Sequence, residues 1–414
     1  MQIAIIGGGI GGLAAAIALE RAGHEPVVYE RQAPEAALDQ QGVFLTLAIN
    51  GQVALAALGA GEQARALGFA TGGIRFASGR GKVLGALPIG PRLDDGTTAR
   101  TVRRTQLLAL LTQLAEARGI RIEQGRELVG VTELSNGVEL NFADGSTARA
   151  DLLVGADGLS SRVRRLVHPG ARSPRYTGVL NTGGFARVAG VDWDGGDYWM
   201  TWGHRCFFGH TVAPDGEVWW FANPPEPTEP PRGSLRERTP EQIRASLLEL
   251  LADDAGPAAR IVAATEGSLQ LWAQHDLPSI PRWTTARTVL LGDAAHAVSP
   301  TTGQGASLAL EDAVILARCL AADGQGSSPA RAVLATRSGG AVSEALAAYE
   351  AARRARVEKI AAWGRRTGNT KTAGPIARRI TDLMMPPMLK LAGSASAQRR
   401  QAWIHDFDPT AHQA

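Results

Sequence analysis

The first thirty residues alternate between short apolar runs and a cluster of glycines. Gln2 to Ile6 is mostly apolar, glycines follow between Gly7 and Gly12, and an alanine-rich stretch then continues to Gly23. The short apolar run predicts a buried strand, and the alanine-rich stretch predicts a helix that Gly23 ends. A second apolar run, Pro26 to Tyr29, predicts a strand that ends at Glu30. This strand, helix, strand order predicts the start of a doubly wound parallel sheet.

The same α/β character continues to about residue 174 and returns near residue 286. A strong helical pattern runs from Arg103 to Gly119, with leucines on one face. Further apolar runs predict strands at Ile120–Glu123, Glu127–Glu133, Val138–Phe142, Thr147–Val154 and Thr288–Leu291. A helix is expected from about Gly305 to Ala321.

Between these parts the pattern changes. From Tyr176 to Trp283 aromatic residues are frequent and helical periodicity fades, which predicts a second, mainly β domain. One helix, about Pro240 to Ala255, interrupts it. The stretch Gly324 to Gly340 predicts a loose connection, and helices are expected from Val342 to Gly364 and again from Pro375.

Composition narrows the class of protein. The chain has 414 residues, of which 44% are hydrophobic and 20% charged, and this excludes disordered and fibrous proteins. Cys206 and Cys319 lack any paired spacing, so neither a disulfide framework nor a zinc site is expected, and a cytoplasmic location fits best. We expect no signal peptide and no membrane span, because no apolar run reaches about 20 residues.

Charge is unevenly distributed along the chain. The net charge is +3, but residues 349–400 carry twelve Lys and Arg against three acidic residues. A solvated, arginine-rich helical tail explains this better than a nucleic-acid site, because no aromatic residues are regularly interleaved with the arginines. We therefore expect no nucleic-acid partner.

The glycine cluster matches a dinucleotide-binding motif. Gly7, Gly9 and Gly12 fit G-x-G-x-x-G directly after a strand and at the start of a helix, which is the context that gives this motif its meaning. The amino end of the helix would present free N–H groups to a pyrophosphate. Glu30 lies where a carboxylate accepts hydrogen bonds from an adenosine ribose and repels a 2′-phosphate. This favours FAD or NAD over NADP as the tightly held dinucleotide.

Two further segments separate FAD from NAD. With the glycine cluster as the first motif, the second motif runs from Asp151 to Gly158 and continues to Arg164. The third motif runs from Leu290 to His296 and continues through Gly303-Gln304-Gly305. Together with the glycine motif, they resemble the class A flavoprotein monooxygenases, the para-hydroxybenzoate hydroxylase-like family. The resemblance covers residues 2 to about 320. The long helical tail looks most like the tetracycline-inactivating members, with polyketide-tailoring enzymes as an alternative, so antibiotic modification is one role to consider.

The resemblance implies an FAD site in which the flavin carries the chemistry, with no certain catalytic side chain and no metal. Its expected cofactor-binding residues are Gly7, Gly9, Ile10, Gly12, Glu30, Arg31, Arg104, Asp157, Arg164, Asp293, Pro300, Gly303, Gln304 and Gly305. Asp293 would bind the ribityl chain, and Pro300 and Gly303 would line the ring. The helix start at Gly305 would stabilise negative charge on the reduced flavin. His296 is expected to orient its loop.

The matching residues of the second motif have a further implied role. Asp157 and Arg164 match positions linked to FAD and to the passage of the nicotinamide cofactor, and Arg104 matches an arginine near the ribityl or phosphate region. No second dinucleotide motif is present, so NADH or NADPH is expected to bind transiently.

The expected architecture has three parts. A discontinuous, Rossmann-like FAD-binding domain comprises residues 1–72, 100–174 and 286–340; a substrate-binding β-sheet domain comprises 73–99 and 175–285; and C-terminal helices occupy 341–414. Apolar walls are needed around the substrate. The candidate substrate residues are Trp202, Phe207, His210, Trp220 and Phe221. Because strand residues alternate between faces, about half of the domain's aromatic residues are expected to be core.

The leading hypothesis is an FAD-dependent, NAD(P)H-consuming monooxygenase. It would transfer one atom of molecular oxygen from a flavin C4a-hydroperoxide to an aromatic or polycyclic small molecule. The outcome, hydroxylation, epoxidation or Baeyer-Villiger insertion, stays open, as do the choice of NADH or NADPH and a monomeric or homodimeric state. The alternatives are a flavin-dependent reductase or dehydrogenase that does not activate oxygen, and a binding or regulatory protein without turnover.

Overall fold

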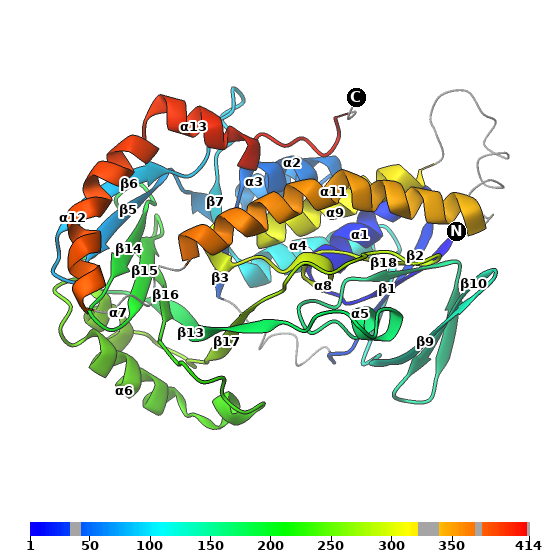
Figure 1. The fold of residues 1–414 in the computed structure, drawn as a ribbon, viewed down its shortest axis with the longest axis horizontal. Helices are drawn as coiled ribbons and strands as arrows, with labels where there is room; N and C mark the ends of the chain where they lie inside the picture. Colours follow the sequence, from blue (N-terminus) through cyan, green and yellow to red (C-terminus); the bar gives the residue numbers. More distant parts are fainter. Residues whose placement is uncertain (34–42, 322–338, 369–374, 412–414) are drawn as a thin grey trace.

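The parallel sheet predicted for the amino-terminal region is present. The computed structural model describes residues 1–33, 43–321, 339–368 and 375–411 (Figure 1). Five parallel strands pair in the order β18 (Thr288–Leu290), β12 (Leu152–Gly155), β1 (Gln2–Ile6), β2 (Glu25–Glu30) and β8 (Arg121–Gln124). Strands buried on both faces need helices on both sides, and the near-continuous burial of Ile3 to Ile6 reflects this.

The strand predicted at Thr147–Val154 is in fact two strands in different sheets. β11 (Thr147–Ala150) pairs with β10 (Gly137–Phe142), and β10 pairs with β9 (Leu128–Leu134), in a small antiparallel sheet. Asp151 lies between β11 and β12, and its carboxylate accepts a hydrogen bond from the backbone N–H of Gln2 (2.8 Å). The chain therefore changes sheets at this residue.

Helices lie around the parallel sheet, and small residues are frequent in the helix that packs on β1 and β2. The helices are α1 (Ile10–Arg21), α4 (Arg104–Ala117), α5 (Arg162–Val167), α8 (Asp293–His296) and α9 (Gly305–Leu320). α1 packs against α9, and a Cβ atom at Gly11 would lie 2.9 Å from Leu291 Cδ2 and 3.3 Å from Ala309 Cβ. The absence of a side chain at Gly11 therefore allows the close approach of α1 and α9.

The mainly β domain contains a seven-stranded sheet. Its order is β17 (Trp272–Asp276), β13 (Arg175–Ala186), β16 (Val218–Asn223), β15 (Phe207–Val212), β14 (Tyr198–Trp202), β5 (Gly73–Ser78) and β6 (Val83–Pro88). A further sheet, β3 (Phe44–Leu47), β7 (Arg100–Arg103) and β4 (Phe69–Ala70), lies beside α2 (Ile49–Ala57) and α3 (Gly61–Ala66). Strands from two separate stretches of chain thus form one sheet; the exact domain boundaries stay a prediction.

Two helices cover one face of the seven-stranded sheet. α6 (Pro240–Leu251) starts at a capping box between Thr239 and Gln242, and ends four residues earlier than the sequence pattern predicts. α7 (Ala258–Ala263), of six residues, was not expected from the sequence, because so short a segment has little periodicity. Both pack with the buried side chains of β15 and β16 into a second hydrophobic core.

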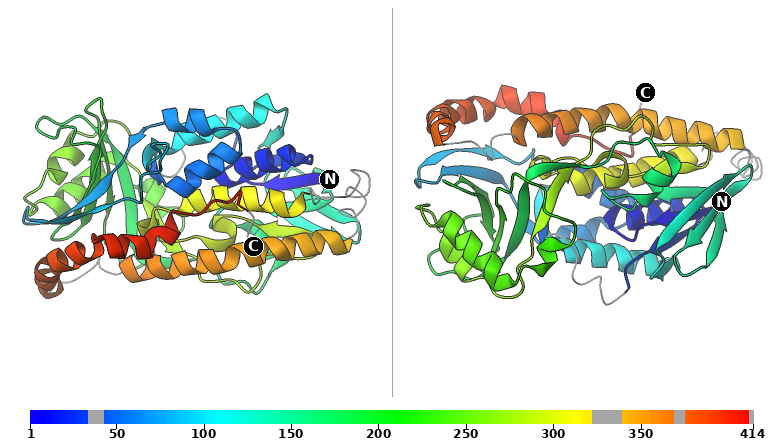
Figure 2. Two further views of the ribbon diagram at one scale, coloured as in Figure 1. Left: turned by 90° about the horizontal axis from the view of Figure 1, so that it is seen from above. Right: turned by 60° about the horizontal axis from the view of Figure 1, so that its bottom comes forward.

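The C-terminal region is helical, as predicted. α11 (Gly339–Gly368) runs along α9 and against the 3₁₀ turn Pro300–Thr302, whereas α12 (Pro375–Ala392) runs along β6 and is followed by α13 (Ala395–Gln401) (Figures 1 and 2). Most of the connection predicted at Gly324–Gly340 lies outside the described residues. Within the described ranges, no helix is long and apolar enough to cross a membrane.

Candidate flavin and substrate site

The glycine turn between β1 and α1 has the geometry of a phosphate-binding loop. A side chain at Gly12 would overlap the carbonyl oxygen of Gly7, which itself has a φ of +111°. A Cβ atom at Gly9, by contrast, would have no atom within 4 Å. Gly9 is the N-cap residue of α1 and offers no side-chain cap, so the first N–H groups of the helix can meet an anion. Ile10 is buried behind the turn.

Glu30 lies beside this turn at the end of β2. Its Oε2 accepts a hydrogen bond from the backbone N–H of Gly8 (2.7 Å), and its Oε1 accepts one from Gln32 (2.8 Å). These bonds fix the carboxylate next to the helix start, where the ribose of a dinucleotide would lie. Arg31 follows it and is exposed.

Asp157 and Arg164 make contacts within the protein. The Asp157 carboxylate accepts hydrogen bonds from the Ser161 hydroxyl (2.5 Å) and from two backbone N–H groups at the start of α5. Arg164 is 1% exposed and donates to the carbonyl oxygens of Ala294 and Leu159, both at 2.6 Å. Arg164 therefore joins the second motif to the third, and both side chains position loops rather than reach outward.

The third motif forms an exposed surface at the start of α9. Asp293, Pro300 and Gly303 are all accessible to solvent, and Gly303 has a φ of +60°. Cβ atoms at Gly303 and Gly305 would have no neighbour within 4 Å, and the N-cap residue Gln304 offers no side-chain cap to the helix. A planar group could thus approach the backbone N–H groups there. Gln304 itself is buried, at 1% exposure.

Asp293 and Arg104 form an electrostatic pair at this surface. Protein surrounds the Asp293 carboxylate and raises its pKa, although the charges of His296 and Arg104 act in the opposite direction. Burial likewise lowers the pKa of Arg104, against the effect of Asp293. Asp293 is nevertheless exposed by surface area, and this combination places it in a recess of the surface. A carboxylate in such a position suits the hydroxyl groups of a ribityl chain.

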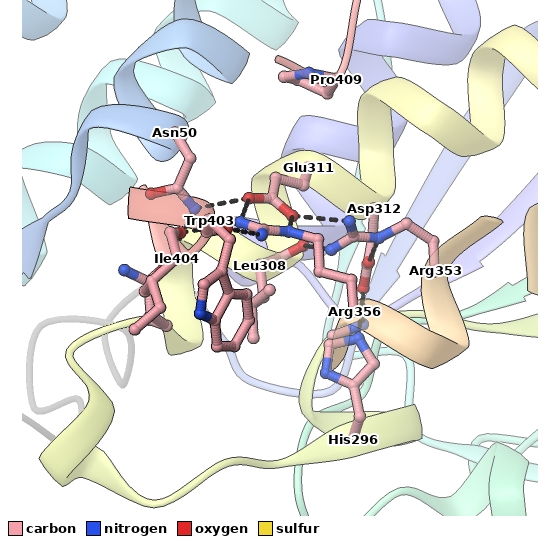
Figure 3. Close-up of polar contacts among 12 residues, drawn as sticks. Asn50, His296, Leu308, Glu311, Asp312, Arg353, Arg356, Trp403, Ile404 and Pro409 are labelled. Atoms are coloured by element: carbon pink, nitrogen blue, oxygen red, sulfur yellow. Dashed lines mark hydrogen bonds and ion pairs between the residues drawn. The ribbon is translucent and has the colours of Figure 1, made fainter. Parts of the chain in front are cut away.

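A buried network of charges supports the third motif from behind (Figure 3). Arg353 of α11 is 0% exposed and lies 2.6 Å from both Glu311 Oε2 and Asp312 Oδ1. Arg356 donates two hydrogen bonds to Glu311, at 2.7 and 2.9 Å. His296 Nε2 lies 2.6 Å from Asp312 Oδ2. Although burial acts to raise the pKa of Asp312, the charges of His296 and Arg353 bring it below its usual range.

The network reaches both parts of the motif. Asp312 Oδ2 accepts a hydrogen bond from the backbone N–H of Gly292, next to Asp293 (2.9 Å). Asn50 of α2 donates to both Glu311 Oε1 (2.6 Å) and Gln304 Oε1 (2.9 Å). Arg353, Arg356 and Asn50 were not predicted from the sequence as supporting residues. The two arginines lie three residues apart on a predicted helix, which was the available signal in the sequence. Their carboxylate partners lie about 45 residues earlier in the chain, so local spacing could not identify them.

The seven-stranded sheet divides the candidate substrate residues between its faces. Trp202 contacts Phe207, with ring centroids 5.4 Å apart, and Phe207 contacts Phe221 at 6.1 Å. His210 and Trp220 lie on the opposite face with Phe208, in the core under α6 and α7. The structure therefore does not bring these two residues together with Trp202, Phe207 and Phe221, because neighbouring strand residues point to opposite sides.

We call the first of these sides the aromatic face; its members are Phe76, Tyr198, Trp202, Phe207, Trp219 and Phe221. It faces β3, because the ring of Phe44 lies 6.3 Å from the rings of both Tyr198 and Phe221. The Tyr198 hydroxyl is hydrogen-bonded to Thr101 (2.8 Å), and burial raises the pKa of Tyr198 to about 12. Phe44 and Phe76 were not predicted from the sequence, because they come from other parts of the chain.

The opposite, core face explains the state of His210. The side chain is 5% exposed, and its Nδ1 has no hydrogen-bond partner among the described residues. Burial lowers the pKa of His210 to about 4. His210 is therefore a neutral core residue stacked on Trp199, with ring planes 10° apart.

Comparison with known proteins agrees with this geometry. Residues 1–363 match the family described as FAD binding domain. An aurachin C monooxygenase/isomerase from Stigmatella aurantiaca is 32% identical over 374 residues, covering 89% of each chain. The structure of a variant of Klebsiella pneumoniae HpxO, complexed with FAD, superposes with a TM-score of 0.79 at 25% identity and covers 98% of both chains.

A tetracycline destructase, Tet(51), shares the fold at 19% identity, with a TM-score of 0.67 and coverage of 96% of this chain and 97% of its own. The glycine turn, the exposed start of α9 and the recessed Asp293 fit a bound FAD. The chain is a flavin-dependent enzyme that belongs to the class A flavoprotein monooxygenase family.

Proposed function

We propose that this enzyme uses NADH or NADPH and molecular oxygen to insert one oxygen atom into an aromatic or polycyclic small molecule. Two electrons from the nicotinamide and two from the substrate reduce dioxygen, so that one atom enters the product and the other leaves as water. The bound flavin supplies the hydride acceptor and the site of oxygen activation. The residues of this chain must hold the flavin, orient the substrate and exclude water.

The observation that carries the proposal is the position of β3 and of the segment after it. Phe44, at the start of β3, contacts the aromatic face, and Thr46 is hydrogen-bonded to Tyr198 (3.2 Å). Ala48, just after β3, donates to the Ser307 hydroxyl at the start of α9 (3.3 Å). One short segment thus contacts both the proposed flavin surface and the apolar wall, so we propose that the substrate binds between them.

The residues between the start of α9 and the aromatic face are proposed to have different roles in binding flavin and substrate. The amino end of α9 stabilises negative charge that develops on the pyrimidine side of a reduced flavin. Asp293 and Arg104 hold the ribityl chain. Trp202, Phe207 and Phe221 are proposed to exclude water and orient an apolar ring system, because a dry cavity protects the activated oxygen from release as peroxide.

The test measures electron use and oxygen transfer together. The FAD-loaded enzyme is given NADH or NADPH with a panel of phenols and polyketides, and nicotinamide oxidation, peroxide release and product mass are recorded. We expect one panel member to accelerate oxidation, with little peroxide and with one atom of isotopically labelled oxygen in the product. A reduced product without the label would show a reductase instead. The cytoplasmic location and a monomeric or homodimeric state stay predictions.

A further inference from the structure

The outer side of α12 carries half of the large hydrophobic residues that are exposed in the described part of the chain. Leu383, Met384, Met388 and Leu391 are 74%, 51%, 63% and 69% exposed. Their spacing places them on one side of the helix, because each residue turns the helix by about 100°. We call these four residues the outer stripe of α12. Such a stripe on a surface helix usually faces a partner.

The inner side of the same helix packs on the sheet. Leu389 is 9% exposed, and its Cβ lies 3.0 Å from the position that a Cβ atom of Gly85 would occupy. Gly85 pairs with Phe76 in β5, which belongs to the aromatic face. α12 therefore covers the outer end of the aromatic face and turns the stripe away from the protein, at one end of the molecule (Figures 1 and 2).

Exposed positive charges lie on α12 and on the segments next to it. Lys390 is adjacent to it on α12, and Arg399 and Arg400 follow on α13. Helix and strand run in the same direction, since Leu389 lies at Gly85 and Gly393 at Leu87. The amino-terminal turns of α12 consequently lie toward the β5–β6 hairpin, where Arg80 and Lys82 are exposed. The only acidic residue of α12 and α13 is Asp382, which is half-buried.

We propose that α12 docks the enzyme on the surface of a bilayer that contains anionic phospholipids. The apolar stripe would enter the boundary between headgroups and acyl chains, and the cations would bind lipid phosphates. A second copy of this chain fits less well, because two such basic surfaces repel each other. Four side chains on one helix also supply much less than the roughly 800 Å² per partner of a stable interface.

Docking would have a consequence for the proposed substrate. α12 alone separates the outer end of the aromatic face from the lipid, a distance of about one helix diameter, or roughly 10 Å. An apolar substrate dissolved in the bilayer would then be close to the site. This consequence rests on the proposed function, whereas the docking does not.

Sedimentation with vesicles tests the proposal without any activity measurement. The FAD-loaded enzyme is mixed with vesicles of phosphatidylcholine alone or of phosphatidylcholine with phosphatidylglycerol. We expect binding to the mixed vesicles that is at least about tenfold stronger and that weakens with salt. The triple variant Leu383→Ser, Met388→Ser, Leu391→Ser should lose at least about tenfold in affinity. The double variant Lys82→Gln, Lys390→Gln should lose about tenfold on mixed vesicles only.

Matched controls separate docking from misfolding and from self-association. Leu134→Ser changes an exposed apolar residue of β9, 37% exposed, and should leave vesicle binding unchanged. Flavin content and circular dichroism of all variants should match the wild type. Absence of vesicle binding, equal binding of the triple variant, or a dimer that the triple variant converts to monomers without any vesicle binding would each overturn the proposal.

Discussion

Replacement of Arg353 by methionine tests whether α11 stabilises the segment 292–305, which we propose to bind the flavin. Methionine keeps much of the length and apolar stem of the side chain but removes the charge. In the described part of the chain, the variant leaves the His296 imidazole hydrogen-bonded to Asp312, and Glu311 keeps both hydrogen bonds from Arg356. Both carboxylates are 0% exposed, so the lost partner cannot be replaced by bulk water.

The expected magnitude follows from this burial. Removal of one partner from a buried ion pair destabilises a protein by about 3–5 kcal/mol. Because His296 and Arg356 remain, we expect the lower end, about 3 kcal/mol. Arg149→Met is the matched control: its side chain is 76% exposed and pairs with Glu139 at the surface, so a loss below about 1 kcal/mol is expected.

The assay is urea unfolding at neutral pH in saturating FAD, followed by tryptophan fluorescence and, separately, by flavin fluorescence. Arg353→Met should lower the unfolding free energy and also weaken FAD binding, because Asp312 fixes the backbone N–H of Gly292. A loss no larger than that of Arg149→Met, with unchanged FAD affinity, would refute the reasoning.

Three further predictions concern other contacts. Gly364→Ala should weaken FAD binding, because a Cβ atom there would overlap the Thr302 methyl group in the turn Pro300–Thr302. Gly340→Ala is the control, because a Cβ atom at this position of the same helix would have no neighbour within 4 Å. Titration with FAD compares the two variants. Asp293→Ala should weaken FAD binding about 10- to 100-fold through loss of a charged hydrogen-bond acceptor; unchanged flavin content would count against this placement of the ribityl chain. The pKa of His210 is about 4 in the folded protein and 6.5 in the unfolded chain, so the unfolded chain binds a proton at higher pH than the folded protein does. The wild type should therefore lose up to about 3 kcal/mol of unfolding free energy as the pH falls from 6.5 toward 4. His210→Phe should remove that dependence in urea unfolding at several pH values, and an unchanged slope would show that His210 is not its source.

The local motifs of the site could be predicted from the sequence because each lies within one turn. Gly7, Gly12 and Gly303 have conformations or close contacts that glycine alone tolerates, so their spacing identifies the turns directly. The parallel sheet followed for the same reason, since its strands are short apolar runs next to those turns. The boundary at Asp151 could not be predicted, because the strands on its two sides pair with different strands, and β12 pairs with β1 at the start of the chain.

The substrate wall could be predicted only in part. Alternation along β15 and β16 shows that Trp220 and Phe221 point to opposite sides, but not which side the helices α6 and α7 cover. That choice depends on packing between distant segments, as does the position of Phe44 against Tyr198. The partners of Arg353 could not be predicted either, because no local rule pairs two helices that lie about 40 residues apart.

The dependence of the segment 292–305 on α11 also bears on how the protein is made. Until Arg353 and Arg356 have left the ribosome, Glu311 and Asp312 lack the arginines that neutralise them in the folded protein. Burial of two unpaired carboxylates is costly, so we expect α9 to dock fully on α1 only once these arginines are present. We accordingly expect FAD to bind only after α11 has been made, and a chain that ends before α11 to bind FAD weakly.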